Sequence, residues 1–192
     1  MQLKDIAQVK AGYTFRGAIE SDTHGDVFVL QAKDLNQGQS VVQTNSLARI
    51  SADTVRNPYT LQKNDILIIA RGMKSGSFRS AVYVSEAKNV IASSSLHIIR
   101  LRDSNVSPEY VSLYLNSKEG QDMLSQFVSG SYIGLLPRAA LENIRIPIPS
   151  REKQDIVVQL YRNAEAQKKI TNRRNELNEH ILHAVFERLT TV

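Results

Sequence analysis

The chain has 192 residues, contains no cysteine and carries a net charge of +5 at neutral pH. The missing cysteines exclude disulfides, thiol nucleophiles and cysteine metal cages, and no apolar run approaches the roughly 18 residues of a membrane span. The N-terminus lacks the apolar core of a signal peptide, so we expect a cytoplasmic protein, and the basic excess favours an anionic partner, first of all nucleic acid.

The N-terminal half contains short apolar runs that are rich in β-branched or aromatic residues, as is typical of strands. Four such runs can make a sheet. The pair Asn64 and Asp65 predicts a turn into one of them, and the loop RGMKSGSFRS (71–80) then leads to the next. The runs are VFVL (27–30), ILIIA (66–70), AVYV (81–84) and LHIIRL (96–101).

Helices are predicted next along the chain. Ser107 and Pro108 provide an N-cap and a proline at the first helical position. The apolar positions that follow predict one helix or two, ending near Gly130, with Gly120 as a weak point. After the loop GSYIG (130–134), Pro137 begins a short helical stretch that reaches Leu141.

The stretch NIRIPIPSREKQDIVVQL (143–160) changes its periodicity halfway. Isoleucines alternate with Pro147 and Pro149, which predicts a proline-stiffened edge strand. Ser150 can then cap a helix that contains neither glycine nor proline up to the last residue. A helix over 151–189 is roughly 58 Å long and must project from a small domain. We therefore expect an α+β fold, with a β-rich globular domain over 1–149 and a coiled-coil-type helix over 150–192.

In a heptad repeat, the seam positions of this helix are apolar at both ends and polar in the middle, which indicates an imperfect coiled-coil seam. The ends can pair with another helix. The middle holds a basic cluster that is open to three interpretations: a solvated face, a contact with DNA, or a contact with an acidic partner. The cluster consists of Lys168, Lys169, Arg173 and Arg174.

The order of these elements resembles the specificity subunit of type I restriction-modification systems. The resemblance rests on LKDIAQVKAGYTFRG (3–17), LQKNDILIIARG (61–72), SPEYVSLYLNSKEGQDML (107–124), GSYIGLLPRAALENIRIPIP (130–149) and SREKQDIVVQL (150–160). The family often has glycine where this chain has Asn64, and proline and leucine where it has Ser150 and Arg151. Family members usually carry two target-recognition domains and two spacer helices, so this chain resembles half a subunit.

The resemblance implies a DNA-recognition protein that is not itself an enzyme. Its partners would be double-stranded DNA and the methyltransferase and restriction subunits, which would bind S-adenosylmethionine, ATP and Mg²⁺, while this chain needs no cofactor. A half-subunit could homodimerise through its helix and read a bipartite inverted repeat. The residues expected in the dimer interface are Ile156, Leu160, Ile170, Leu177, Ile181 and Val185.

Candidate DNA contacts lie in three loops and after the first strand. The loop 71–80 is basic and contains serines that can bond the backbone or bases. The loop 130–134 presents a tyrosine between small residues. The candidates are Arg71, Lys74, Ser75, Ser77, Arg79, Ser131, Tyr132, Lys33, Thr14 and Arg16. Charge alone equally allows a solvated hairpin loop at 71–80, and the tyrosine could pack back onto the core.

Two other classes of function remain as alternatives. The first is a non-catalytic interaction protein that pairs through its helix with a restriction-modification complex and modulates it. The second is a hydrolase that uses the histidines or the run Ser93 to Ser95. No GxSxG or HExxH pattern supports a hydrolase. We therefore expect structural serines at a strand entry and place His180 and His183 on a surface or interface.

Overall fold

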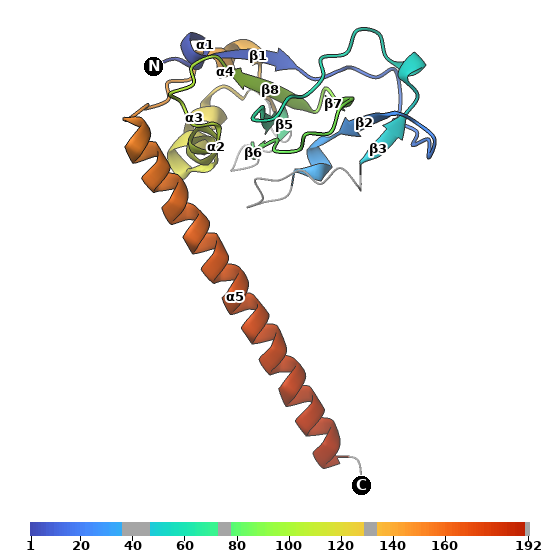
Figure 1. The fold of residues 1–192 in the computed structure, drawn as a ribbon, viewed down its shortest axis with the longest axis vertical. Coiled ribbons are helices and arrows are strands. Elements are labelled where there is room, and N and C mark those ends of the chain that lie inside the picture. Colours follow the sequence, from blue (N-terminus) through green and yellow to red (C-terminus); the bar gives the residue numbers. More distant parts are fainter. Residues whose placement is uncertain (36–46, 73–77, 129–133, 191–192) are drawn as a thin grey trace.

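The computed structural model describes residues 1–35, 47–72, 78–128 and 134–190. A β-rich globular part carries a long helix that projects from one side (Figure 1). The elements are α1 (Leu3–Ile6), β1 (Ala7–Ala11), β2 (Val27–Leu30), η1 (Ala32–Asp34), β3 (Ala48–Ile50), η3 (Ala52–Thr54), β4 (Ile66–Ile69), β5 (Arg71–Gly72), β6 (Ser80–Val82), β7 (Val90–Ala92), β8 (Leu96–Leu101), α2 (Pro108–Asn116), α3 (Lys118–Gln126), β9 (Gly134–Leu135), α4 (Arg138–Asn143) and α5 (Arg151–Thr190).

The main sheet has the strand order β1-β8-β4-β6, and all neighbours are antiparallel. All four residues of β4 are buried, because Ile66 and Ile68 enter the core beneath the helices while Leu67 and Ile69 enter a second core on the opposite face. Burial on both faces explains why this run is continuously apolar rather than alternating. The predicted α+β class is confirmed.

The four predicted strand runs do not share one sheet. β2 pairs with β3 and β7 in a separate sheet of order β3-β2-β7, where its pairing with β7 is parallel. The strands β3 and β7 have only three residues each, too few to show a period in the sequence. Figure 1 shows β2 and β3 on the side of the globular part opposite to the origin of α5.

The helical region contains two helices, and the break lies at Ser117 rather than at Gly120. The hydroxyl of Ser117 donates to the carbonyl oxygen of Tyr114 and accepts from the N–H of Gly120, so it ends α2 and caps α3. A Cβ at Gly120 would lie 2.1 Å from the Tyr114 carbonyl oxygen. The glycine therefore lets the two helices approach closely and does not break either of them.

The predicted edge strand before α5 is not a strand. The chain bridges antiparallel only at Gln2 and Arg145, where the N–H of Ile146 donates to the Met1 carbonyl oxygen at 2.9 Å. Pro147 then has no N–H with which to continue a ladder. Ile144 and Ile146 are nevertheless buried in the core beneath the helices, so the segment is an extended connection anchored to the N-terminus.

The first turns of α5 are fixed to the globular part by a buried glutamine. Gln154 is 1% exposed, accepts from the N–H of Ser107 at 2.8 Å, and donates to the carbonyl oxygens of Asn105 and Pro149. Farther along, Arg162 pairs with Glu109 of α2. From Ala166 to Thr190 every residue of α5 is exposed. Across the described ranges of the chain, no helix is long and apolar enough to cross a membrane.

Candidate nucleic-acid interface

The two loops selected from the sequence leave the globular part side by side. β5, at the start of loop 71–80, pairs antiparallel with β9, at the end of loop 130–134, with Arg71 opposite Leu135 and Gly72 opposite Gly134. The two segments are more than 60 residues apart in the sequence. The strand from which the first loop continues thus lies next to the strand at which the second loop ends.

The far end of the first loop is held by α3. Phe78 is fully buried, and its backbone N–H and C=O both bond the side-chain amide of Gln121, at 3.1 and 2.9 Å. Gln121 is 9% exposed and also donates to the carbonyl oxygen of Leu115. The role of Gln121 could not be predicted from the sequence, because it depends on a contact with a residue 43 positions away.

The end of the second loop, at β9, also depends on close packing. A Cβ at Gly134 would lie 1.6 Å from a methyl carbon of Val128, so a larger residue there would have to displace the Val128 side chain. The next residues dock on the end of β4, since the N–H of Leu136 donates to the Ala70 carbonyl oxygen at 2.9 Å. The buried ring of His97 donates from Nε2 to the Leu136 carbonyl oxygen at 2.8 Å. Both loops therefore start from a rigid frame, as is common for binding loops.

The turn Ser93 to Ser95 connects the segments that carry the remaining candidates to the end of β4. The backbone of Ser95 accepts from the N–H of Ala70, and its hydroxyl accepts from the N–H of Ala32 at the start of η1. Ser94 donates its N–H to the carbonyl oxygen of Tyr13. The segments that carry Thr14, Lys33 and Arg71 therefore meet at this turn. The prediction of structural serines is consistent with these contacts, but their connecting role was missed.

Five candidates can be placed. Arg71, Lys33, Thr14 and Arg16 are exposed and Arg79 is half-buried. Among the described residues, neither Arg71 nor Arg79 has a carboxylate partner. No acidic residue occurs between Ile66 and Val84, so this stretch of the sequence has a net positive charge. The other five candidates, Lys74, Ser75, Ser77, Ser131 and Tyr132, lie outside the described residues.

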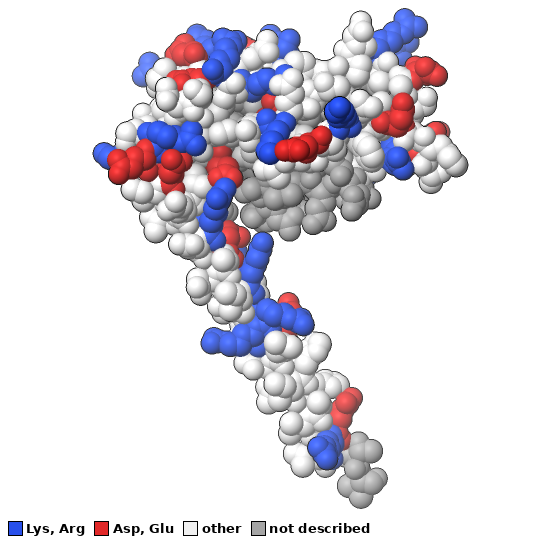
Figure 2. Space-filling model, viewed as in Figure 1, with Lys and Arg blue, Asp and Glu red and all other residues white. Residues whose placement is uncertain are grey.

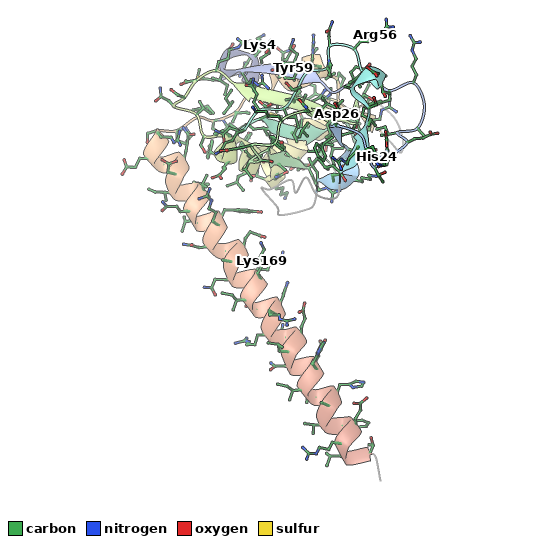
Figure 3. All side chains as sticks on the ribbon, turned by 45° about the vertical axis from the view of Figure 1, so that its right-hand side comes forward. Lys4, His24, Asp26, Arg56, Tyr59 and Lys169 are labelled. Atoms are coloured by element: carbon green, nitrogen blue, oxygen red, sulfur yellow. The ribbon has the colours of Figure 1, made fainter. Side chains whose placement is uncertain are left out.

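Basic side chains also occur away from these loops. Figure 2 shows Lys and Arg over the upper part of the globular part, along its junction with α5 and at the middle of that helix. The middle group includes Lys169, which is labelled in Figure 3 and points away from the helix axis. Arg173 in the same group pairs with Glu176 at 3.0 Å, so part of this charge is compensated.

The four histidines lie in different parts of the described structure. His24 lies 3.9 Å from Asp22, whereas His180 and His183 are exposed on α5. Burial lowers the pKa of His97, whose ring is enclosed near Leu136. Over the ranges that the structure describes, no group of three histidine, cysteine or acidic side chains could hold a metal ion.

The six residues predicted to form a dimer interface are all exposed, from 46% at Leu177 to 63% at Leu160. Further large apolar residues of α5 are also exposed: Val157 and Tyr161 near its start, and Leu182, Phe186 and Leu189 near its end. Large apolar surface of this extent normally marks an interaction site.

The sequence matches the family described as type I restriction modification DNA specificity domain over residues 1–185. No curated protein matches it significantly. Solved structures show a similar fold. The HsdS subunit from Thermoanaerobacter tengcongensis is 17% identical with a TM-score of 0.60, and the match covers 91% of this chain and 38% of that chain.

Two further structures are similar. A chain from a study of complex assembly and conformational transition of the type I R-M system is 18% identical, with a TM-score of 0.66, and 96% of this chain and 42% of that chain are covered. The S subunit from M. genitalium is 17% identical, with a TM-score of 0.57 and coverage of 100% and 46%. The chain therefore spans less than half the length of these structures.

Proposed function

The chain belongs to the type I restriction modification DNA specificity domain family, and from this premise we propose that it reads one half-site of a bipartite DNA target through the loops around β5 and β9. The observation that carries the proposal is the convergence of these loops. Their roots share the β5–β9 ladder, and the segments with Thr14 and Lys33 meet them at the turn Ser93 to Ser95.

Chemistry supports double-stranded DNA as the ligand. Arginine can bond guanine edges or neutralise phosphates, while serine hydroxyls bond either bases or backbone. The basic stretch 66–84 has no carboxylate that would repel phosphate. A rigid frame with short variable loops lets related domains read different sequences without changing their fold.

The proposal assigns the chemistry of restriction and modification to partner subunits. The globular domain (1–149) would bind DNA, and the helix (150–192) would pair with a second copy and hold the methyltransferase and restriction subunits. S-adenosylmethionine, ATP and Mg²⁺ would bind to those partners, and this chain would be non-catalytic. The exposed apolar residues of α5 support a role in assembly.

Selection from a randomised duplex library, followed by sequencing, tests the function. We expect one short motif to be enriched, and to occur twice as an inverted repeat at a fixed spacing. The variant Arg71→Ala/Arg79→Ala should lose the enrichment, whereas Lys88→Ala/Lys153→Ala, which removes the same charge elsewhere, should keep it. Equal recovery of all sequences, together with tight binding to a methyltransferase subunit, would replace DNA reading by the interaction-protein alternative.

A further inference from the structure

The helix α4 connects the end of the second candidate loop to α1. Two residues before α4, the carbonyl oxygen of Leu136 accepts from His97, which lies opposite Ala11 at the end of β1. After α4, the carbonyl oxygen of Ile144 accepts from the N–H of Leu3 in α1 at 2.9 Å. α4 therefore runs back along β1, from the loops toward α1. Figure 1 shows α1 and α4 beside β1 at the upper edge of the globular part.

A groove of about 320 Å³ is lined by residues of α1, β1 and α4 and by one residue that follows β8. Ala7 and Val9 of β1 are only 2% and 4% exposed, so the groove presents side chains rather than strand backbone to a ligand. Most of the polar side chains in its lining are cationic. The cations are Lys4, Lys10, Arg102 and Arg138.

Positive charge exceeds negative charge in this groove. Glu142 is the one carboxylate of its lining and lies 3.3 Å from Arg138. The other three cations have no carboxylate partner among the residues that the structure describes. Lys4 donates instead to the neutral amide oxygen of Asn143 at 2.9 Å. Three positive side chains are therefore available to an anionic ligand.

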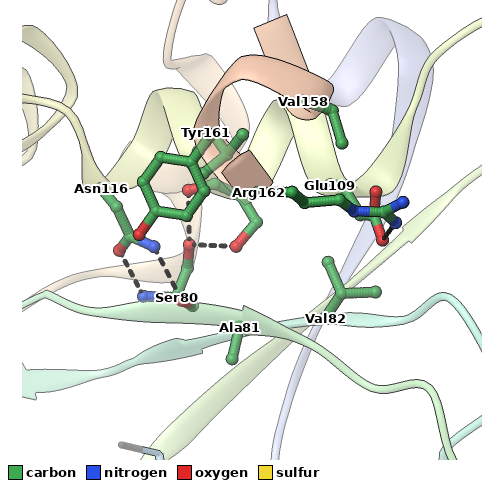
Figure 4. Close-up of a pocket in the computed structure, with 10 residues that line it drawn as sticks. Ser80, Ala81, Val82, Glu109, Asn116, Val158, Tyr161 and Arg162 are labelled. Atoms are coloured by element: carbon green, nitrogen blue, oxygen red, sulfur yellow. Dashed lines mark hydrogen bonds and ion pairs between the residues drawn. The ribbon is translucent and has the colours of Figure 1, made fainter. Parts of the chain in front are cut away.

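The cavity at the opposite edge of the main sheet, between β6, α2 and α5, has a different character. Its lining contains one cation, Arg162, which pairs with Glu109. Asn116 bonds the backbone N–H and C=O of Ser80, both at 2.8 Å (Figure 4). These polar groups are used within the fold. The excess of positive charge is thus a property of the groove beside β1 and not of both edges.

The groove is continuous with the candidate DNA loops. Arg138 follows the end of loop 130–134 by four residues, and β9 at that end pairs with β5 of the first loop. Lys4 lies at the other end of α4, where it bonds Asn143. The six residues of α4 correspond to about 9 Å. This length matches about two or three phosphates along one DNA strand, at roughly 3.4 Å each.

We propose that the groove between α4 and β1 binds phosphate groups of the DNA that flanks the half-site on one side. Lysine and arginine bond phosphate oxygens without reading the sequence, and the side-chain amide of Gln8 in the lining can add a further hydrogen bond. Continuity with the loops favours DNA over an acidic protein surface. The inference rests on the proposed function, because it takes the loops around β5 and β9 as the contact with the half-site.

Salt-dependent binding to three duplexes tests the inference. Each duplex contains one copy of the motif that library selection enriches. One duplex ends at the motif, and the other two continue for about ten base pairs on one side or on the other. For the wild type, extension on one side only should steepen the slope of log K against log salt, by about 1.8 if two phosphates are bound.

Matched variants assign this increase to the groove. Lys4→Gln/Arg102→Gln changes two exposed side chains and should lose the increase, while its slope on the shortest duplex stays that of the wild type. Lys88→Gln/Lys153→Gln removes the same charge elsewhere and should keep the increase. Preference for the motif over a scrambled duplex of the same length should be the same in all three proteins.

The failures of the inference and of the proposed function can be told apart. If Lys4→Gln/Arg102→Gln has the wild-type slope on every duplex while Arg71→Ala/Arg79→Ala loses motif enrichment, the groove does not bind DNA and the proposed function stands. An equal loss of slope on the shortest duplex would place the groove on the half-site itself and overturn the flanking contact. If no motif is enriched but the slope still depends on Lys4 and Arg102, phosphate binding in the groove stands and sequence reading does not.

Discussion

Arg71 and Arg79 flank the segment that the structure holds between β5 and the buried Phe78. Their guanidinium groups have no carboxylate partner among the described residues. Because Ile69 donates to the Arg79 carbonyl oxygen and Arg71 pairs with Leu135, the backbone of both arginines is fixed. Fixed backbone with free positive side chains is suited to phosphate contacts.

The variant Arg71→Ala/Arg79→Ala tests these contacts on any duplex that the protein binds. Each lost phosphate contact removes about 0.9 from the slope of log K against log salt, so the slope should become shallower by about 1.8. Fluorescence anisotropy over a salt series measures this. Lys88→Ala/Lys153→Ala serves as the control with the same change in net charge, and an unchanged slope for the arginine variant would remove both residues from the interface.

His97, which bonds Leu136 after β9, should make the folding stability of the protein sensitive to acid. Its Nε2–H donates to Leu136, while Nδ1 is buried without a partner, so a second proton would have no acceptor. Burial, which outweighs the hydrogen bond to Leu136, lowers the pKa of His97 below its ordinary value of 6.5. Below that pH the unfolded chain takes up a proton that the folded chain resists, so stability falls as the pH falls.

Replacing His97 by glutamine keeps an amide N–H for Leu136 and removes the titration. We expect the free energy of unfolding of the wild type to fall, relative to His97→Gln, as the pH decreases from 6.5 toward the lowered folded pKa. Urea denaturation across this range checks it, with His24→Gln, which changes an exposed histidine, as the control. Parallel pH profiles for the wild type and His97→Gln would contradict the assignment.

At the scale of the elements, few residues of α5 contact the globular part, and Gln154 is the most buried of these residues. Three backbone groups of the connections at Asn105–Ser107 and Pro149 depend on its amide. Ser107 in turn caps α2 through Tyr110, and the Tyr110 hydroxyl donates to Pro147. Gln154 therefore connects α5 to the globular part. It belongs to the segment SREKQDIVVQL (150–160), on which the family resemblance partly rests.

Gln154→Leu should make the orientation of α5 relative to the globular part less fixed. Leucine has a similar size but leaves the three backbone groups unsatisfied, which should cost about 3 kcal/mol of folding free energy. Pairs of spin labels on Lys88→Cys and Gln167→Cys report the direction of α5, and the distance distribution should broaden in the variant. Gln159→Leu, an exposed position of the same helix, should leave both stability and distances unchanged. A narrow distribution in Gln154→Leu would show that the remaining contacts, such as the packing of Val158 and the Arg162–Glu109 pair, suffice to orient the helix.

The elements that depend on local sequence could be predicted, and those that depend on distant pairing could not. α5 and the cap of α2 at Ser107 follow from spacing and capping residues, and the strands 27–30 and 96–101 have the predicted bounds. β5 and β9 have two residues each and exist only because they pair with each other. The assignment of β2 to a second sheet likewise depends on the three-residue β7, which has no period of its own.

The candidate site could be predicted only in outline. Basic and glycine-rich loops were recognised from composition, but Gln121 and Ser95, which hold their ends, are ordinary polar residues in the sequence. Their roles come from hydrogen bonds to residues that are distant along the chain. Polar residues that support binding loops are thus harder to predict than the loops themselves.

At the scale of the whole molecule, the long helix dominates the shape. Its 40 residues correspond to about 60 Å, and only its first turns pack on the globular part. The exposed large apolar residues of α5 lie mainly near its two ends, and the mostly basic and polar stretch between them contains Ile170. A helix of this kind is marginal on its own and gains stability when its apolar residues pack against another helix.

Pairing of two α5 helices predicts a dimer in solution. Leu177→Lys or Ile181→Lys places a charge in the apolar stripe and should weaken the dimer by at least tenfold, because a lysine at a helix seam is costly. Light scattering over a concentration series measures the change, starting from a mass near twice 21.5 kDa. Asn172→Lys is the matched control, since nine residues before Ile181 correspond to about two and a half turns and hence to the opposite face.

If two copies pair through α5, the symmetry of the dimer also predicts the arrangement of the half-sites in the DNA that it would bind. Two copies related by a two-fold axis present the same loops in opposite directions, so an inverted repeat fits them and a direct repeat does not. The lysine variants should bind a single half-site with the affinity of the wild type. They should lose the increase in affinity that a second half-site gives to the dimer. If the wild type is a monomer at all concentrations and still prefers the inverted repeat, partner subunits rather than α5 pairing would have to supply the symmetry.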